Sequence, residues 1–220
     1  MKSTVFTVFS WLVTLILPLI LVLLGVRILL NTSYPNLAYN MPGFPDDSYG
    51  LTKQDRLYWS RYAIDYLIND AGIEYLGDLK FSDGAPLYNQ RELSHMLDVK
   101  ILVQKVLRLF YVLIALLIGL GLWAYFGKWW REYQLGIWRG GWLTVGLIVG
   151  LGAFAAVSFW QFFTYFHELF FTGDSWIFYY SDTLIRLFPM RFWQDVFMFG
   201  LGFAVISGLV IGFFLKPKSA

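Results

Sequence analysis

The chain has 220 residues, of which 58% are hydrophobic, 20% are aromatic and only 15% are charged. Soluble globular domains carry about 45–50% apolar and about 25% charged residues, so this composition excludes an ordinary water-soluble protein. The net charge of +2 comes without a basic tract, which argues against nucleic-acid binding, and the absence of cysteine excludes disulfides, thiolate catalysis and cysteine-based metal sites. We therefore predict a small integral membrane protein.

Four apolar stretches are long enough to cross the roughly 30 Å hydrocarbon core of a bilayer, which takes about 20 helical residues. We place transmembrane helices at residues 1–30, 100–127, 142–166 and 192–220, the last range ending in a cytoplasmic tail. Between them lie an extracytoplasmic domain at 31–99 that leads into the second helix, a cytoplasmic loop at 128–141 and an extracytoplasmic interfacial segment at 167–191. The expected fold class is an all-α membrane protein with four transmembrane helices and a small mixed extracytoplasmic capping domain between helices 1 and 2.

The Lys and Arg residues of the short loops predict the orientation of the helices. Those beside the transmembrane helices fall on one side of the predicted topology: Lys2, Lys128, Arg131, Arg139, Lys216 and Lys218. The positive-inside rule makes this side the cytoplasm, so both termini are expected inside and the segments 31–99 and 167–191 outside. The predicted location is the cell (plasma) membrane, with the active site on the extracytoplasmic side.

The first outer segment is too long and too patterned to be a simple connector. Its first part, 31–50, is rich in Tyr, Pro, Asn and Gly and predicts an irregular loop. Thr52 and Asp55 then form a capping-box pattern at the start of a helix that is expected to run to Gly72. A short extended piece is predicted at Leu79–Phe81, which makes the domain mixed rather than helical.

A second capping box, Asn89 with Glu92, predicts the start of a helix that continues into the second transmembrane helix. This helix begins with an unusual number of polar side chains, the most prominent being Arg91, Glu92, His95, Asp98 and Lys100. Charges at this depth are costly and usually face a bundle interior or a wet cavity. Lys100 alone is explained equally well by snorkelling at a helix end. For the set as a whole we predict a functional cavity.

The second outer segment opens with the other histidine of the chain, His167, at the outer end of the third transmembrane helix. A lone histidine at a helix end is often only an interfacial hydrogen-bonding residue. Here the topology places both His95 and His167 at the same membrane boundary, which favours a shared site. The stretch Trp176–Trp193 has few charges and many aromatic residues, which predicts a helix in the interface plane or a plain aromatic belt.

Two histidines suit general acid–base catalysis, because their ordinary pKa of about 6.5 lies near neutral pH. One would take a proton from a nucleophile supplied by the substrate, and the other would return a proton to the leaving oxygen. Arg91, Lys100 or Arg186 would hold a developing oxyanion or a lipid headgroup. The ligand spacing of zinc enzymes is absent, so no metal and no cofactor are expected. These residues indicate acid–base chemistry on a lipid-related substrate of the outer leaflet.

Two blocks of the sequence resemble the signatures of a bacterial integral membrane family, the lipoprotein intramolecular transacylase (Lit) family. Leu87–Lys100 is similar to its R-E-x-x-H-M-x-D-V-K signature, and the block from Phe166 to Trp193 is similar to its second. The resemblance implies transfer of the sn-2 acyl chain of a diacylglyceryl lipoprotein to the α-amino group of its N-terminal cysteine, leaving the lyso form. The paired histidines of the family match His95 and His167.

The resemblance and the residues together predict an acyltransferase with His95 and His167 as the catalytic pair. The predicted substrate-binding residues are Arg91, Glu92, Asp98, Lys100, Trp176, Asp182 and Arg186. The expected partners are the diacylated lipoprotein substrate and membrane lipid, with no nucleic acid. The chain is expected to be membrane-embedded and monomeric.

Two alternatives stay open at this point. A zinc-dependent membrane hydrolase acting on lipid would use the same residues as metal ligands. A non-enzymatic membrane partner protein would bind through the outer domain, with small-residue pairs such as Gly146/Gly150 and Gly208/Gly212 packing the helices. The second alternative leaves the polar set of the second transmembrane helix without a purpose.

Overall fold

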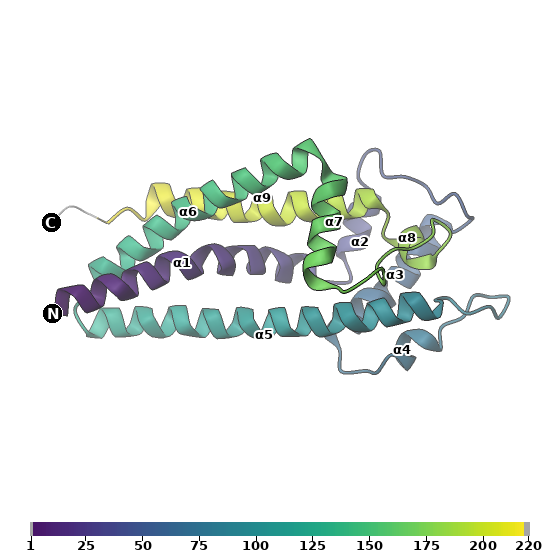
Figure 1. The fold of residues 1–220 in the computed structure, drawn as a ribbon, viewed down its shortest axis with the longest axis horizontal. Helices are drawn as coiled ribbons and strands as arrows, with labels where there is room; N and C mark the ends of the chain where they lie inside the picture. Colours follow the sequence, from purple (N-terminus) through teal and green to yellow (C-terminus); the bar gives the residue numbers. More distant parts are fainter. Residues whose placement is uncertain (1, 218–220) are drawn as a thin grey trace. The chain divides into compact units, whose positions relative to one another are not determined.

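A computed structural model of the chain describes residues 2–217 (Figure 1). The described residues form helices and connecting loops, without a strand other than the isolated bridge between Lys80 and Pro86. In chain order the helices are α1 (Lys2–Leu29), α2 (Tyr34–Tyr39), α3 (Lys53–Ile68), α4 (Glu74–Gly77), α5 (Gln90–Phe126), α6 (Trp130–Val157), α7 (Phe159–Phe170), α8 (Thr183–Leu187) and α9 (Met190–Phe214). The predicted all-helical fold class is confirmed.

Four of these helices are long and apolar enough to cross a membrane: α1, over Thr4–Leu29, and α5, α6 and α9 over their whole lengths. The four apolar stretches of the sequence therefore correspond to four helices, as their length predicts. The chain divides into two compact units, which we call the bundle unit and the site unit. The bundle unit comprises the described parts of 1–28, 106–158 and 198–220, and the site unit comprises 29–105 and 159–197.

Small residues let the helices of the bundle unit pack closely. The Thr14 hydroxyl on α1 donates to the carbonyl oxygen of Gly136 on α6 at 3.2 Å. Between α6 and α9, a Cβ atom at Gly208 would lie only 2.7 Å from the carbonyl oxygen of Gly141, so a side chain does not fit there. A Cβ atom at Gly150 would meet nothing within 4 Å. Of the two small-residue pairs seen in the sequence, only the one that contains Gly208 therefore packs a helix within this unit.

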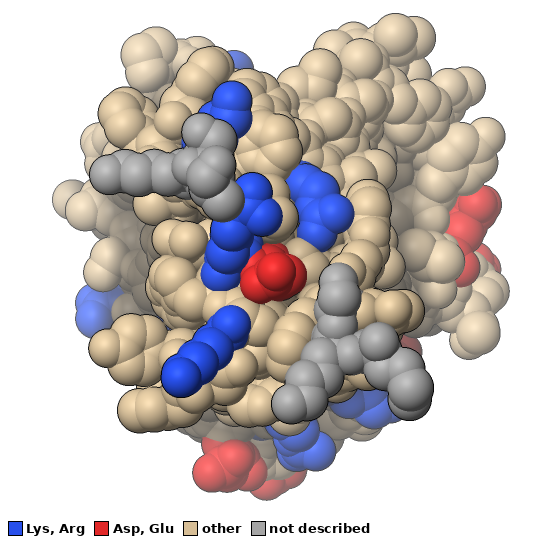
Figure 2. Space-filling view, turned by 90° about the vertical axis from the view of Figure 1, so that its left-hand side faces the viewer, with Lys and Arg blue, Asp and Glu red and all other residues tan. Residues whose placement is uncertain are grey.

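Basic side chains gather at the end of the bundle unit where α1 begins and α9 ends (Figures 1 and 2). A depression at this end is lined by Lys128, Arg131 and Lys216, beside the single acidic residue Glu132. The basic residues around the start of α6 and after the end of α9 thus lie together, as the sequence topology requires. Of the other residues used in that argument, Lys218 lies outside the described residues and Lys2 is described only by its backbone. The assignment of this end to the cytoplasm stays a prediction.

The third long helix differs from its predicted range of 142–166. It begins at Trp130, so most of the predicted cytoplasmic loop at 128–141 is helical. It ends at Val157, because Ser158 has an extended backbone (φ −152°, ψ 96°). The last part of the predicted span, from residue 159 onward, is instead a separate helix, α7, which belongs to the site unit.

The early start of α6 depends on the surroundings of Arg139, a residue expected in the cytoplasmic loop because of its charge. The Arg139 guanidinium lies 4.2 Å from the centroid of the Trp11 ring on α1 and donates a hydrogen bond to the Ser10 hydroxyl. A cation held over an indole face and bonded to a hydroxyl is compatible with a helix interior. The charge of Arg139 therefore does not mark a loop.

In the site unit, both predicted capping boxes are present. The Asp55 N–H donates to the Thr52 hydroxyl at 3.1 Å, and the Asp55 carboxylate accepts from the Thr52 N–H at 2.9 Å, so α3 begins where the sequence predicts. At the start of α5 the same exchange joins Asn89 and Glu92, at 2.8 and 3.0 Å. Each exchange satisfies backbone N–H groups that have no partner inside the helix.

Three other predictions for the site unit need correction. The expected mixed domain is helical within the described residues, and the expected loop at 31–50 contains α2, whose early Pro35 suits a first helical turn. The helix expected at Trp176–Trp193 is instead a turn region followed by α8 and then by the start of α9. Pro189 separates these two helices, because proline lacks the N–H that a continuous helix needs.

Candidate active site

The two histidines of the chain lie together in the site unit. His95 comes from the second turn of α5 and His167 from the last turn of α7. Their ring centroids are 6.2 Å apart and the ring planes are inclined by only 24°. Both side chains are buried, with 8% and 9% of their surfaces exposed. The pairing expected from the predicted topology is therefore present in the geometry.

Hydrogen bonding distinguishes the two rings. Nδ1 of His167 lies 2.8 Å from the carbonyl oxygen of Phe163, one helical turn earlier. Because a carbonyl oxygen only accepts, Nδ1 carries the proton in this hydrogen bond and Nε2 keeps its lone pair. Nδ1 of His95 is buried and has no hydrogen-bond partner among the described residues. His167 is thus oriented by the protein, whereas His95 retains a free ring nitrogen.

Aromatic side chains surround both imidazoles. The Phe171 and Phe178 rings lie 5.0 and 5.3 Å from His95, and the Trp176 ring lies 4.9 Å from His167. Burial lowers the pKa of His167 below its ordinary value, although the hydrogen bond to Phe163 acts in the opposite direction. His167 is therefore a neutral imidazole at neutral pH and can accept a proton. The indole Nε1 of Trp176 is buried without a partner among the described residues, so it is a free donor next to this base.

Buried hydrogen bonds of Glu92 hold the stretch of chain that follows Trp176 and contains Phe178. One carboxylate oxygen of Glu92 accepts from the N–H of Leu184 at 2.7 Å, and the other accepts from Asn89, as described above. The carboxylate is 1% exposed, so both hydrogen bonds are buried and charge-assisted. The first turn of α8 is in this way tied to the first turn of α5, three residues before His95.

Three further contacts hold the same two stretches together. The Asn89 side chain donates to the Asp182 carboxylate at 3.1 Å, and the Thr183 hydroxyl donates to the carbonyl oxygen of Leu87. The Arg91 guanidinium donates to the carbonyl oxygen of Ile177 at 3.1 Å. Residues 177–184 therefore form a strap across the start of α5, which we call the strap segment.

Two predicted substrate-binding residues, Lys100 and Asp98, lie apart from the histidine pair. Lys100 donates to the side-chain oxygen of Asn69 at 3.1 Å, and its ammonium lies 4.0 Å from the centroid of the Tyr66 ring. Asp98 is exposed, unlike Glu92 and His95 on the same helix. Among the described residues, neither Lys100 nor Asp98 forms a hydrogen bond with an imidazole.

Arg186 is part of an ion pair that the sequence did not predict. It donates to the Asp47 carboxylate, with Nη2 at 3.1 Å, and only 3% of the Asp47 side chain is exposed. Burial acts to raise the pKa of Asp47, but the hydrogen bonds from Arg186 and from the backbone of Leu51 and Tyr49 outweigh it and lower the pKa. This pair joins α8 to the loop before α3, so Arg186 has a partner within the protein.

The structure thus brings His95, His167 and Trp176 together and uses Glu92, Asp182 and Arg91 to hold the strap segment. Sequence reasoning missed the phenylalanines around the imidazoles, because aromatic residues are common throughout this chain. Within residues 2–217 no group of three His, Asp or Glu side chains is arranged to hold a metal ion.

Comparisons with known proteins show the family of the chain. A family model described as lipoprotein intramolecular transacylase Lit matches residues 11–193. An uncharacterised protein of Aquifex aeolicus is 30% identical over 218 residues, covering 96% of this chain and 98% of that protein. The crystal structure of the membrane-integral transacylase Lit from Bacillus cereus is similar in fold, with a TM-score of 0.55 and 21% identity over 94% of this chain and 86% of that one. A histidine-to-arginine variant of that protein gives a TM-score of 0.52 and 22% identity, over 94% and 82% of the chains. Since the family model spans most of the sequence, this multi-pass membrane protein belongs to the lipoprotein intramolecular transacylase Lit family.

Proposed function

We propose that this chain moves the sn-2 acyl chain of a diacylglyceryl lipoprotein to the α-amino group of the lipoprotein's N-terminal cysteine, at a site built on His95 and His167. The observation that carries the proposal is the pair of buried imidazoles with centroids 6.2 Å apart, one oriented by a backbone carbonyl and one with a free ring nitrogen. Membership of the Lit family supports the reaction class.

We assign His167 as the base. The attacking group is an amine whose ordinary pKa is about 7.7–8.0, so it must lose a proton when its nitrogen attacks the ester carbonyl carbon. The Phe163 carbonyl holds the Nδ1 proton of His167, which leaves Nε2 as the acceptor. A base whose tautomer and orientation are already set needs no reorganisation during the reaction.

The bonds and protons balance without a nucleophile from the enzyme. The amine nitrogen forms a bond to the carbonyl carbon, the bond from that carbon to the glyceryl oxygen breaks, and an amide and a free hydroxyl result. His167 takes the proton from the amine and passes it, through the bound group, to His95, which delivers it to the departing oxygen. Both imidazoles are then neutral again, as they were at the start. Because the amine and the ester belong to one molecule, holding them together supplies much of the rate.

Trp176 supplies the remaining polar contact in this proposal. Its indole N–H is buried without a partner and lies beside His167, so it suits the oxygen that gains negative charge in the tetrahedral intermediate. Arg91, Glu92 and Asp182 act indirectly, by holding the strap segment in place. We further propose that the site faces outward, that lipoprotein and membrane lipid are the partners, and that the chain acts as a monomer.

The test is mass spectrometry of the N-terminal lipopeptide of a model lipoprotein, from cells that make only diacylated lipoproteins, with and without this chain. Transfer leaves the total mass unchanged while one acyl chain moves from glycerol to the amine. We expect His95→Asn and His167→Asn each to lower the rate by about 10²–10⁴-fold, the usual worth of a general acid or base. Glu168→Gln is the matched control, since Glu168 is exposed beside His167.

Two outcomes contradict the proposal. Loss of one acyl mass with a free amine makes the protein a hydrolase. Full activity of both histidine variants removes the pair from the mechanism. Each variant is first shown to be expressed and to unfold at the wild-type temperature, so that a loss of rate is not a loss of protein.

A further inference from the structure

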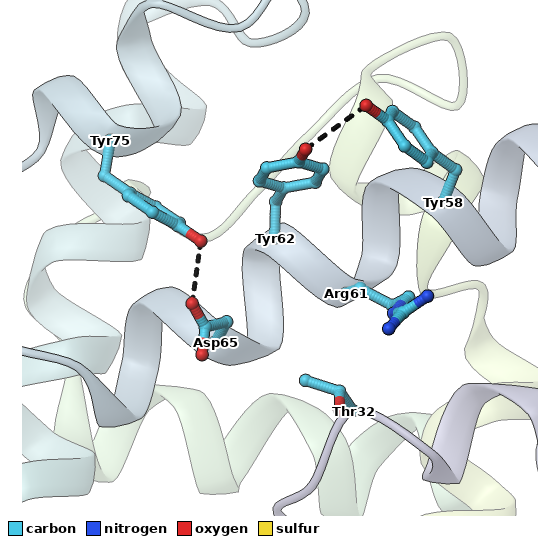
Figure 3. A pocket seen from close by; sticks show the side chains of 6 residues that line it. All are labelled: Thr32, Tyr58, Arg61, Tyr62, Asp65 and Tyr75. Atoms are coloured by element: carbon cyan, nitrogen blue, oxygen red, sulfur yellow. Dashed lines mark hydrogen bonds between the residues drawn. The ribbon is translucent and has the colours of Figure 1, made fainter.

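A pocket in the site unit shares no residue with the histidine site. Its volume is about 420 Å³, and it is lined by Thr32, Tyr58, Arg61, Tyr62, Asp65 and Tyr75 (Figure 3). This volume lies within the range of small-molecule sites, roughly 300–1,000 Å³. Four of the six residues come from consecutive turns of α3, and Tyr75 comes from α4.

The pocket holds one positive and one negative charge that do not neutralise each other. Arg61 and Asp65 are four residues apart on α3, a spacing at which opposite charges commonly pair. No hydrogen bond or ion pair of Arg61 is found within residues 2–217, and Figure 3 shows the guanidinium and the carboxylate standing apart. One oxygen of Asp65 accepts from the Tyr75 hydroxyl at 2.7 Å and from Asn69 at 3.3 Å, which leaves its other oxygen open.

Three tyrosines complete the lining. The hydroxyls of Tyr58 and Tyr62 are hydrogen-bonded to each other at 3.2 Å, so the pair retains a donor for an additional acceptor. The hydrogen bond to Asp65 is the main cause that raises the pKa of Tyr75 to about 12, so this side chain stays a neutral phenol. Tyrosine faces attract cations within about 6 Å. A ligand with both an anionic and a cationic group fits this set of side chains.

The pocket lies close along the chain to two apolar helices. Thr32 follows the end of the first apolar helix, Leu29, by three residues, which span at most roughly 10 Å. On the other side, Asp65 is bonded to Asn69, which accepts from Lys100, directly before the apolar part of α5. The headgroup layers of a bilayer are only several ångströms thick, about 5–8 Å each.

We propose that this pocket binds the headgroup of a zwitterionic phospholipid that carries a phosphate and a primary ammonium. The phosphate lies against the Arg61 guanidinium and a tyrosine hydroxyl, and the ammonium lies against the free oxygen of Asp65 and the tyrosine rings. Charge-assisted contacts of this kind are strong and select for the arrangement of the two charges. The proposal does not depend on acyl transfer at the histidine site.

The experiment uses the full chain in detergent and three probes: a short-chain phosphatidylethanolamine, a phosphatidylglycerol with the same acyl chains, and inorganic phosphate. Binding is measured by titration calorimetry. We expect the phosphatidylethanolamine to bind roughly tenfold more tightly than the phosphatidylglycerol, the ratio that one additional charged contact of about 1.4 kcal/mol gives. Inorganic phosphate alone is expected to compete only weakly.

The variants separate the two halves of the pocket. Asp65→Asn keeps an oxygen for the Tyr75 hydroxyl but removes the negative charge, so it should abolish the preference for the ammonium lipid. Arg61→Gln should weaken both lipids about equally. Asp78→Asn and Lys80→Gln are matched controls on exposed residues outside the pocket, and they should change neither affinity.

Several results overturn the proposal. Equal binding of the two lipids removes the role of the ammonium, and equal binding of phosphate makes the pocket a simple anion site. Unchanged affinities in Asp65→Asn and Arg61→Gln place the lipid elsewhere. A peptide matching the residues after the lipidated cysteine that binds instead of lipid, and is lost in Arg61→Gln, makes this a peptide site.

Discussion

Replacing Glu92 by glutamine is expected to loosen the strap segment and to destabilise the protein. In the native structure the two carboxylate oxygens accept from the N–H groups of Leu184 and Asn89, at 2.7 and 2.8 Å, in surroundings where Glu92 is 1% exposed. Glutamine keeps one acceptor oxygen, but its NH₂ group faces the second N–H donor. One buried donor is left unsatisfied, which costs about 1–3 kcal/mol, and the remaining hydrogen bond is no longer charge-assisted. Together these losses should lower the free energy of unfolding by roughly 2–4 kcal/mol.

The assay is unfolding of the purified protein in detergent, with Asp98→Asn as the control. Asp98 lies on the same helix and is exposed, so its substitution should change stability by no more than about 0.5 kcal/mol. Because the strap segment carries Phe178 to the His95 ring, acyl transfer should fall as well. If Glu92→Gln unfolds at the same temperature as Asp98→Asn, the carboxylate does not hold the strap segment and the reasoning is refuted.

Three further predictions concern His167, Lys100 and Gly208. Burial lowers the pKa of His167, the base in our proposal. Protonation of the substrate amine, whose ordinary pKa is about 7.7–8.0, will by itself reduce the rate as the pH falls. After division by the fraction of free amine, the rate should stay level through pH 6.5 and fall only as the pH passes below the lowered pKa of His167; a second titration at or above about pH 6.5 would contradict this. Lys100→Met removes buried hydrogen-bond donors from α5 and should lower the free energy of unfolding by about 1–3 kcal/mol. Lys105→Met, on an exposed residue of the same helix, should leave stability nearly unchanged. Equal effects in thermal unfolding would exclude an anchoring role for Lys100. Gly208→Leu should destabilise the bundle unit by about 1–3 kcal/mol or more, while Gly150→Leu, whose side chain meets open space, should not. The two variants are compared by unfolding in detergent. Equal stabilities would mean that α6 and α9 do not pack at Gly208.

Local signals in the sequence predicted the elements whose formation depends on neighbouring residues. The two capping boxes, Thr52 with Asp55 and Asn89 with Glu92, each begin a helix where expected, because they satisfy backbone groups within one turn. Apolar length predicted four long helices for the same reason: a stretch of about 20 apolar residues carries its own signal.

The boundaries that failed depend on contacts with distant residues. The start of α6 at Trp130 is compatible with the charge of Arg139 only because the Trp11 ring on another helix covers the guanidinium. The region around α8 looked like one aromatic helix, yet its course follows its hydrogen bonds to Glu92 and Asn89 across the site unit. Hydropathy along the sequence predicts neither of these long-range contacts.

The candidate site shows the same division. The sequence, through its two histidines and the topology of its apolar stretches, indicated that His95 and His167 belong to one site. Asp98 was predicted to bind substrate but lies on another side of α5. Each three-residue step along an α-helix falls about 60° short of a full turn, so Asp98 is roughly 120° around the helix from Glu92, and it is exposed. Only the tertiary structure decided which polar side chains lie beside the two histidines and which are bonded elsewhere in the site unit. It paired Lys100 with Asn69 and Arg186 with Asp47, because a buried charge must find a partner wherever the packing places one.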